Sequence, residues 1–273
     1  MIDSQGILQG TYTRGNAVGK VVLTRTTLDR LDAMTPPPPI PLYEESLRIP
    51  VTYPTPEGGT QSWQLEATLY RPHPTGRFPV VVFNHGSTGM GRIPVTQTSK
   101  FPIVARYFAE QGWAVLVPMR RGRGQSEGTY EESYQCGREA GGIDRAVEDI
   151  DGVFQFLREQ PWARPNRILI GGQSRGGLLA VVYAGRRPET VKGVINFVGG
   201  WMSEGCVPDA NTRFFRDAAR QATVPMLWLY ADQDPYYSAT TIRRYRAAFE
   251  EAGGRGPFYL FSDTGGERAL FSE

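Results

Sequence analysis

The chain has 273 residues, which suits one large domain or one domain with a tail. Its 30 lysines and arginines nearly balance its 28 aspartates and glutamates, so the net charge is only +2. That balance offers no electrostatic basis for a nucleic-acid partner or for binding to an anionic membrane. No stretch approaches the roughly 20 apolar residues of a membrane span, and the N-terminal residues lack a secretory signal pattern. These features predict a cytoplasmic protein.

The first 41 residues differ from the rest of the chain. They are polar and rich in threonine and glycine, and positions 36–41 read Pro-Pro-Pro-Pro-Ile-Pro. Because a proline run favours a stiff, extended linker, we expect residues 1–41 to form a poorly ordered arm and residues 42–273 to form one domain. A gene start placed too far upstream would be another explanation of this segment.

Alternating strands and helices are predicted from residue 42 onward. Two segments with alternating polarity, 47–51 and 64–70, are typical of antiparallel strands with one solvated face. Continuous apolar runs, typical of strands buried on both faces of a parallel sheet, follow at 79–83, 114–117, 168–170, 194–198 and 226–230, and a last strand is expected at 258–261. Helical patterns lie between them at 101–111, 143–159, 176–187, 212–222 and 239–252. This alternation predicts a doubly wound, mostly parallel α/β sheet with helices on both faces and the active site at the carboxyl ends of the strands.

The expected strand at 168–170 leads into the motif G-x-S-x-G, formed by Gly172, Ser174 and Gly176. A turn from strand to helix within about two residues strains the backbone of the central serine, and side chains two residues to either side would collide. The serine then lies at a helix N-terminus, where the helix dipole favours negative charge. We therefore predict that Ser174 attacks acyl groups and that the N–H of Arg175 donates to the oxyanion. The alternative is a glycine-rich turn with a solvated serine.

A glycine-rich loop after the strand at 79–83 begins with His85, Gly86 and Ser87. Such a loop can direct a second backbone N–H at the oxyanion. We expect His85 to shape this loop, and not to act as the catalytic base, because it lies on the oxyanion side of Ser174.

A carboxylate follows the strand at 226–230. Asp234, which precedes a proline, is better placed than Asp232 to orient a catalytic imidazole, and the order Ser174 then Asp234 fits the chain order Ser, Asp, His. The alternative for either aspartate is a turn-forming role, which is more realistic for Asp232.

With the motif R-G-x-G-x-S-x-G at 121–128, these residues make the chain resemble the α/β-hydrolase superfamily from Leu42 to its last residue. The resemblance is to the dienelactone-hydrolase and prolyl-oligopeptidase-like group of esterases and peptidases. It implies an α/β-hydrolase fold with an eight-stranded sheet, no cofactor, and hydrolysis of a small ester, an amide or a short peptide through an acyl-enzyme.

One part of the family pattern is missing. The family has a histidine after the last strand, but the chain's two histidines, His73 and His85, both precede Ser174. In the corresponding register stands Arg268, which cannot accept a proton. Three explanations remain: a truncated or frameshifted hydrolase, a pseudoenzyme that binds an acyl ligand, or a base supplied by His85 or by a partner chain. The family's terminal helix is missing too, and its loss would expose apolar sheet surface and favour self-association.

Two loops are expected to lie over the site. One spans 125–142 and includes Tyr130 and Tyr134, and the other spans 201–211 and begins with Trp201. Each carries one cysteine, Cys136 or Cys206. In a cytoplasmic protein we expect two free thiols; a disulfide, more natural in an exported protein, would tie the loops together. Neither cysteine has metal-ligand spacing, so no metal site is expected.

Overall fold

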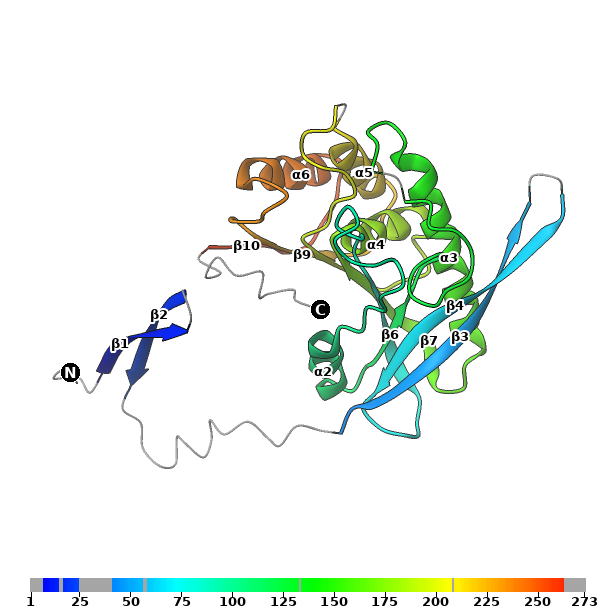
Figure 1. The fold of residues 1–273 in the computed structure, drawn as a ribbon, viewed down its shortest axis with the longest axis horizontal. Coiled ribbons are helices and arrows are strands. Elements are labelled where there is room, and N and C mark those ends of the chain that lie inside the picture. The colour runs from blue at the N-terminus through cyan, green and yellow to red at the C-terminus, as the bar shows by residue number, and fades with distance from the viewer. Residues whose placement is uncertain are drawn as a thin grey trace.

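The computed structural model describes residues 7–14, 17–24, 41–55, 58–132, 134–207 and 209–262. An eight-stranded sheet forms the centre of the main domain (Figure 1). Its strands are β3 (Tyr43–Pro54), β4 (Thr60–Arg71), β5 (Phe78–Asn84), β6 (Ala114–Pro118), β7 (Ala163–Gln173), β8 (Val194–Phe197), β9 (Met226–Ala231) and β10 (Phe258–Phe261). The helices are α2 (Pro102–Glu110), α3 (Glu139–Glu159), α4 (Arg175–Arg186), α5 (Ala210–Ala219) and α6 (Ala239–Glu251).

The strand order is β10-β9-β8-β7-β5-β6-β4-β3. The pairs β3–β4 and β4–β6 are antiparallel, and the other neighbouring pairs in this sheet are parallel. This confirms the predicted mostly parallel, eight-stranded α/β sheet. Because β5, β7, β8 and β9 run in one direction, the segments that follow them gather at one edge of the sheet.

The buried strand β5 shows why its sequence is continuously apolar. Val80 and Val82 belong to the larger core, which includes buried side chains of α3, α4, α5 and α6. Val81 and Phe83 point to the other face, where they pack with side chains of α2. All four are at most 1% exposed, so neither face of the strand tolerates a polar residue.

The N-terminal segment contains a feature that the sequence did not predict. β1 (Ile7–Arg14) and β2 (Ala17–Thr24) pair antiparallel in a separate two-stranded sheet, with Ile7 opposite Thr24 and Arg14 opposite Ala17. The proline run lies outside the described residues up to position 40, so the extended linker stays a prediction.

The expectation of two free thiols is wrong. Cys136, between β6 and α3, forms a disulfide with Cys206, between β8 and α5, and their Cα atoms are 5.5 Å apart. The cysteines are 70 positions apart in sequence, and only the sheet order brings their loops within reach of a disulfide. Disulfides are uncommon in the cytosol, so the cytoplasmic location stays a prediction.

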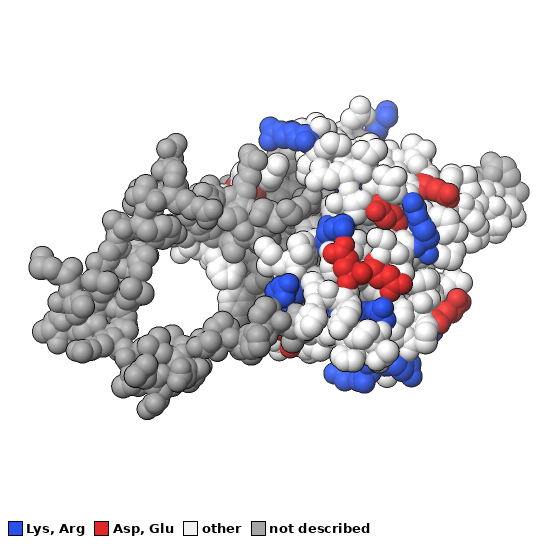
Figure 2. Space-filling model, turned by 60° about the horizontal axis from the view of Figure 1, so that its bottom comes forward, with Lys and Arg blue, Asp and Glu red and all other residues white. Residues whose placement is uncertain are grey.

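Charged side chains of both signs are interspersed on the face shown in Figure 2, and neither sign fills a continuous area of its described surface. Many opposite charges pair, as Arg186 does with Asp144 at 2.7 Å and Arg187 with Asp151 at 2.6 Å. None of the helices that the structure describes is long and apolar enough to cross a membrane.

Candidate active site

Ser174 occupies the turn between the end of β7 and the start of α4. Its backbone has φ 55° and ψ −119°, a conformation that non-glycine residues rarely adopt. The neighbouring glycines make the turn possible, because a Cβ on Gly172 would lie 2.5 Å from the carbonyl carbon of Gly176. A Cβ on Gly176 would lie 2.1 Å from the carbonyl oxygen of Asn84. The motif therefore folds into the strained strand-to-helix turn that it predicts.

The loop after β5 reaches the same turn. Asn84, the last residue of β5, pairs with Gly172 across the sheet, which places the next residues beside Ser174. A Cβ on Gly86 would lie 3.3 Å from the Cβ of Ser174. Ser87 follows, and its Oγ accepts the N–H of Gly89 at 3.1 Å. The structure thus brings Gly86 against the serine, as the sequence predicts.

His85 is fully buried in this loop, and backbone groups contact both of its ring nitrogens. Nε2 accepts the N–H of Arg120 at 3.1 Å, so Nδ1 carries the proton and donates to the Gly86 carbonyl oxygen at 2.7 Å. Burial, followed by the charges of Arg120 and Arg123, holds the pKa of His85 well below its usual value. A neutral, fully bonded imidazole supports the loop-shaping role expected of His85.

The other histidine lies elsewhere. His73 is in the connection from β4 to β5, and its Nδ1 is 3.4 Å from the Thr75 hydroxyl. This connection leads into the amino end of β5, whereas Ser174 follows the carboxyl end of the parallel neighbour β7. His73 and Ser174 are therefore at opposite edges of the sheet.

Asp234 lies in the turn after β9, on the edge of the sheet that carries Ser174. Its Oδ1 accepts the N–H groups of Tyr236 at 2.8 Å and Tyr237 at 2.9 Å. Burial raises the pKa of Asp234, and these two donors offset part of that rise. The backbone N–H of Asp232 instead donates to the Phe261 carbonyl at 2.9 Å, so the side chain that organises this turn is that of Asp234.

The side chain of Arg175 joins the two loops that the sequence places over the site. Its Nε donates to the Trp201 carbonyl at 3.0 Å, and its Nη1 donates to the Glu132 carbonyl at 3.1 Å. The guanidinium lies 4.2 Å from the centre of the Tyr134 ring and 5.1 Å from that of Trp201. Both loops therefore lie at the nucleophile turn, in agreement with the sequence analysis.

Sequence reasoning missed the buried carboxylate of Glu132, which is 8% exposed. It accepts hydrogen bonds from Arg120 through Oε1 and from Arg175 through Oε2. Burial alone would raise the pKa of Glu132, but the charges of these two arginines hold it below its usual value. No local pattern distinguishes it from its exposed neighbour Glu131, because only tertiary contacts bury it.

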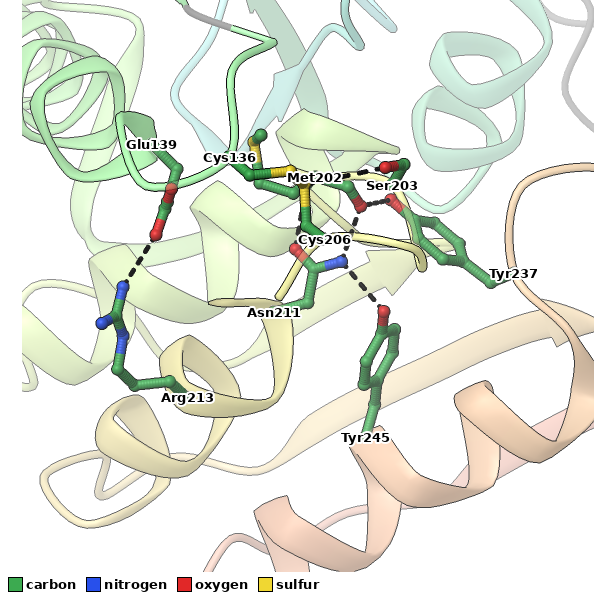
Figure 3. Close-up of a disulfide and its surroundings, with 9 residues drawn as sticks. All are labelled: Cys136, Glu139, Met202, Ser203, Cys206, Asn211, Arg213, Tyr237 and Tyr245. Atoms are coloured by element: carbon green, nitrogen blue, oxygen red, sulfur yellow. Dashed lines mark hydrogen bonds and ion pairs between the residues drawn. A yellow bond between two sulfur atoms is a disulfide. The ribbon is translucent and has the colours of Figure 1, made fainter. Parts of the chain in front are cut away.

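Asn211 on α5, also missed, organises the second loop beside the disulfide (Figure 3). Its Oδ1 accepts the N–H groups of Trp201 and Met202 at 2.9 and 3.0 Å. Its Nδ2 donates to the Met202 carbonyl at 2.8 Å, and the Tyr237 hydroxyl donates to the same oxygen at 3.0 Å. The turn of Asp234, the second loop and the disulfide are thus held together.

The described residues contain no group of three or more His, Cys, Asp or Glu side chains placed to hold a metal ion. A surface groove of about 440 Å³ lies on α5 and α6, and its lining, which does not include Ser174, consists of Asp209, Thr212, Arg213, Arg216 and Arg244. We assign the candidate site to Ser174 because the strained turn and the contact with Gly86 are found there.

The parallel sheet with a strained serine turn at its carboxyl edge defines an α/β-hydrolase fold. Residues 65–265 match the model of the dienelactone hydrolase family, and the chain belongs to this family.

Among curated proteins, the chain is 27% identical to thiohydrolase aneE of Aspergillus aculeatus over 163 residues, which are 59% of this chain and 46% of that protein. It is 31% identical to the quorum-quenching protein AidA of Acinetobacter baumannii over 139 residues, which are 50% of this chain and 41% of that protein. The chain therefore spans less than half the length of these relatives.

Solved structures share the fold. An acetyl xylan esterase from Paenibacillus superposes with a TM-score of 0.56 at 18% identity, covering 84% of this chain and 85% of that chain. The acylaminoacyl peptidase of Pyrococcus horikoshii superposes with a TM-score of 0.57 at 17% identity, covering 95% of this chain and 44% of that chain.

Proposed function

We propose that this protein is a serine hydrolase that cleaves a small ester, an amide or a short peptide through an acyl-enzyme on Ser174. The observation that carries the proposal is the strained backbone of Ser174 between β7 and α4, with Gly86 packed against it. Membership of the dienelactone hydrolase family supports a hydrolase. The two curated relatives differ in their named activities, and the proposal therefore commits only to acyl substrates.

The proposed reaction begins when the Ser174 hydroxyl oxygen attacks the substrate carbonyl carbon. The carbonyl oxygen becomes an oxyanion, which the N–H of Arg175 and an N–H of the loop at Gly86 stabilise. The first N–H groups of a helix are not used by the hydrogen bonds of the helix itself, which suits that of Arg175 to this task. The base takes the proton of the Ser174 hydroxyl and passes it to the leaving group, and water then releases the acyl group from the serine as an acid. Asp234 is the proposed carboxylate that orients the base.

We propose a base other than the chain's two histidines. His85 has both ring nitrogens bonded to the backbone, and His73 lies at the opposite edge of the sheet. Hydrolysis by this mechanism would then need a base that neither histidine supplies, such as one from a partner chain. The alternative function is binding of an acyl ligand without turnover. It is favoured by the hydrogen bonds that both ring nitrogens of His85 make to the backbone.

The experiment is phosphonylation of Ser174 by a fluorophosphonate, read by intact mass with and without added imidazole. The serine oxygen forms a bond to phosphorus, fluoride leaves, and the proton passes to the base. Because imidazole can replace a missing base, we expect labelling to accelerate with imidazole concentration. Ser174→Ala should take no adduct, whereas Ser203→Ala, which changes another serine of the loops over the site, should label like the unmodified protein.

Folded protein that takes no adduct even in imidazole would contradict the hydrolase proposal. The binding alternative would then be tested by the affinity for an acyl ligand, which Ser174→Ala should leave unchanged.

A further inference from the structure

The carbonyl oxygen of Gly86 is surrounded by three buried hydrogen-bond donors. His85 Nδ1 lies at 2.7 Å, Arg123 Nη1 at 3.3 Å and Arg120 Nη2 at 3.4 Å. The carbonyl of the preceding residue, His85, also accepts a hydrogen bond, from Arg120 Nη1 at 2.9 Å. The side chains of the two arginines are only 1% and 2% exposed. Two successive peptide carbonyls of the loop therefore point towards the arginines.

The orientation of these carbonyls determines where the N–H groups of the same peptides point. In a trans peptide the C=O and the N–H are directed to opposite sides. The N–H of Ser87, which shares a peptide with the Gly86 carbonyl, is therefore directed away from Arg123 and Arg120. Gly86 itself packs against Ser174, so this N–H lies in the loop that borders the nucleophile.

We propose that Arg123, assisted by Arg120, is a positioning residue that holds the Gly86–Ser87 peptide so that the Ser87 N–H serves the oxyanion formed at Ser174. The proposal rests on the serine-hydrolase function proposed above. It gives a role to the R-G-x-G-x-S-x-G loop, which the reaction itself did not require.

The neighbouring Arg121 in the same loop makes no contact with the carbonyls of His85 and Gly86 among the hydrogen bonds of the described residues. Arg121 binds carboxylates, with its Nε 2.8 Å from Asp149 and its Nη2 3.1 Å from Glu148. Its contacts fasten the loop to α3. Arg120 also pairs with a carboxylate, that of Glu132, but it and Arg123 in addition donate to carbonyls beside the nucleophile, which Arg121 does not.

The test compares two probes that differ in one atom, a fluorophosphonate and the matching fluorophosphonothioate. Sulfur accepts hydrogen bonds more weakly than oxygen, so a misplaced oxyanion donor slows the oxygen probe more than the sulfur probe. Rate constants for labelling of Ser174 are measured in saturating imidazole for the unmodified protein, Arg123→Gln, Arg123→Lys and the control Arg121→Gln.

We expect Arg123→Gln to slow the oxygen probe by about 100-fold, the scale of a misplaced catalytic group, and to slow the sulfur probe much less. Arg123→Lys should recover part of the rate because its ammonium can still donate to the carbonyl. Arg121→Gln should keep the ratio of the two rates. Equal slowing of both probes in Arg123→Gln would overturn the proposal.

If the unmodified protein reacts with neither probe, the proposed hydrolase function is contradicted. The positioning role is then tested separately by the crystal structure of Arg123→Gln. A turned Gly86–Ser87 peptide in that variant supports the role, and an unchanged peptide overturns it.

Discussion

Gly86 and Ser174 approach each other so closely that a methyl group on Gly86 would lie 3.3 Å from the serine Cβ. They follow two neighbouring parallel strands, β5 and β7, whose last paired residues are Asn84 and Gly172. The nucleophile and the loop proposed to stabilise the oxyanion are therefore in direct contact.

Gly86→Ala should slow fluorophosphonate labelling of Ser174 by about 10-fold or more, because the new methyl group displaces the loop from the serine by a few tenths of an ångström. The rate of adduct formation by intact mass checks this. Gly141→Ala is the control, since a Cβ there meets nothing within 4 Å. An unchanged rate in Gly86→Ala would remove this loop from the proposed oxyanion site.

Reduction of the Cys136–Cys206 disulfide should lower the free energy of unfolding by about 2–4 kcal/mol, because the bond closes a long loop of the unfolded chain. Urea unfolding with and without dithiothreitol measures the change. The double variant Cys136→Ser, Cys206→Ser should be equally destabilised and insensitive to the reductant. Two free thiols titrated in the denatured, unreduced protein would show that the bond does not form.

Glu132→Gln should destabilise the protein by about 3–5 kcal/mol, because it leaves the buried guanidinium groups of Arg120 and Arg175 without their carboxylate. The matched control is Glu131→Gln, whose half-exposed side chain pairs with Arg145 at the surface and should cost less than about 1 kcal/mol. Urea unfolding compares the two. Similar losses in both variants would contradict the structural role of Glu132.

Stability should fall as the pH drops below about 6.5, where His85 gains a proton in the unfolded chain but not in the folded protein. The pKa of His85 is lower in the folded protein than in the unfolded chain. The neutral ring therefore stabilises the fold above the pKa of the unfolded chain, and this stabilisation is lost as the pH falls towards the pKa in the folded protein. The change in the free energy of unfolding should then approach about 1.4 kcal/mol per pH unit, the value for one proton. Urea unfolding between pH 8 and 5 measures it. His85→Gln should flatten this dependence, and an equal dependence in the unmodified protein and in His85→Gln would refute the assignment.

Self-association should occur through the edge strand β10. Tyr259 and Phe261 are 52% and 44% exposed there, and their rings are stacked 6.2 Å apart. An edge strand that carries exposed aromatic side chains favours pairing with another chain. Sedimentation should show concentration-dependent association that Phe261→Lys suppresses and Tyr107→Lys, an exposed site on α2, does not. A monomer at all concentrations would contradict this prediction.

The sequence by itself determined the features that depend on short-range physics. The apolar runs located the strands of the sheet, because their side chains are buried on both faces, as Val80 and Val81 show. The run at 168–170 marks only the buried part of β7, whose exposed polar residues 164–167 extend the strand towards Ala163 without an apolar signal. The turn of Ser174 was predictable because its glycines lie two residues away on either side.

Only the tertiary structure decided which distant groups meet. It paired Cys136 with Cys206, buried Glu132 between Arg120 and Arg175, and bonded both nitrogens of His85 to the backbone. The physical reason is that burial and pairing depend on the order of strands in the sheet, which brings loops together across long stretches of chain. The residues next to a cysteine, a glutamate or a histidine in the sequence do not reveal which partner that side chain meets in the folded chain.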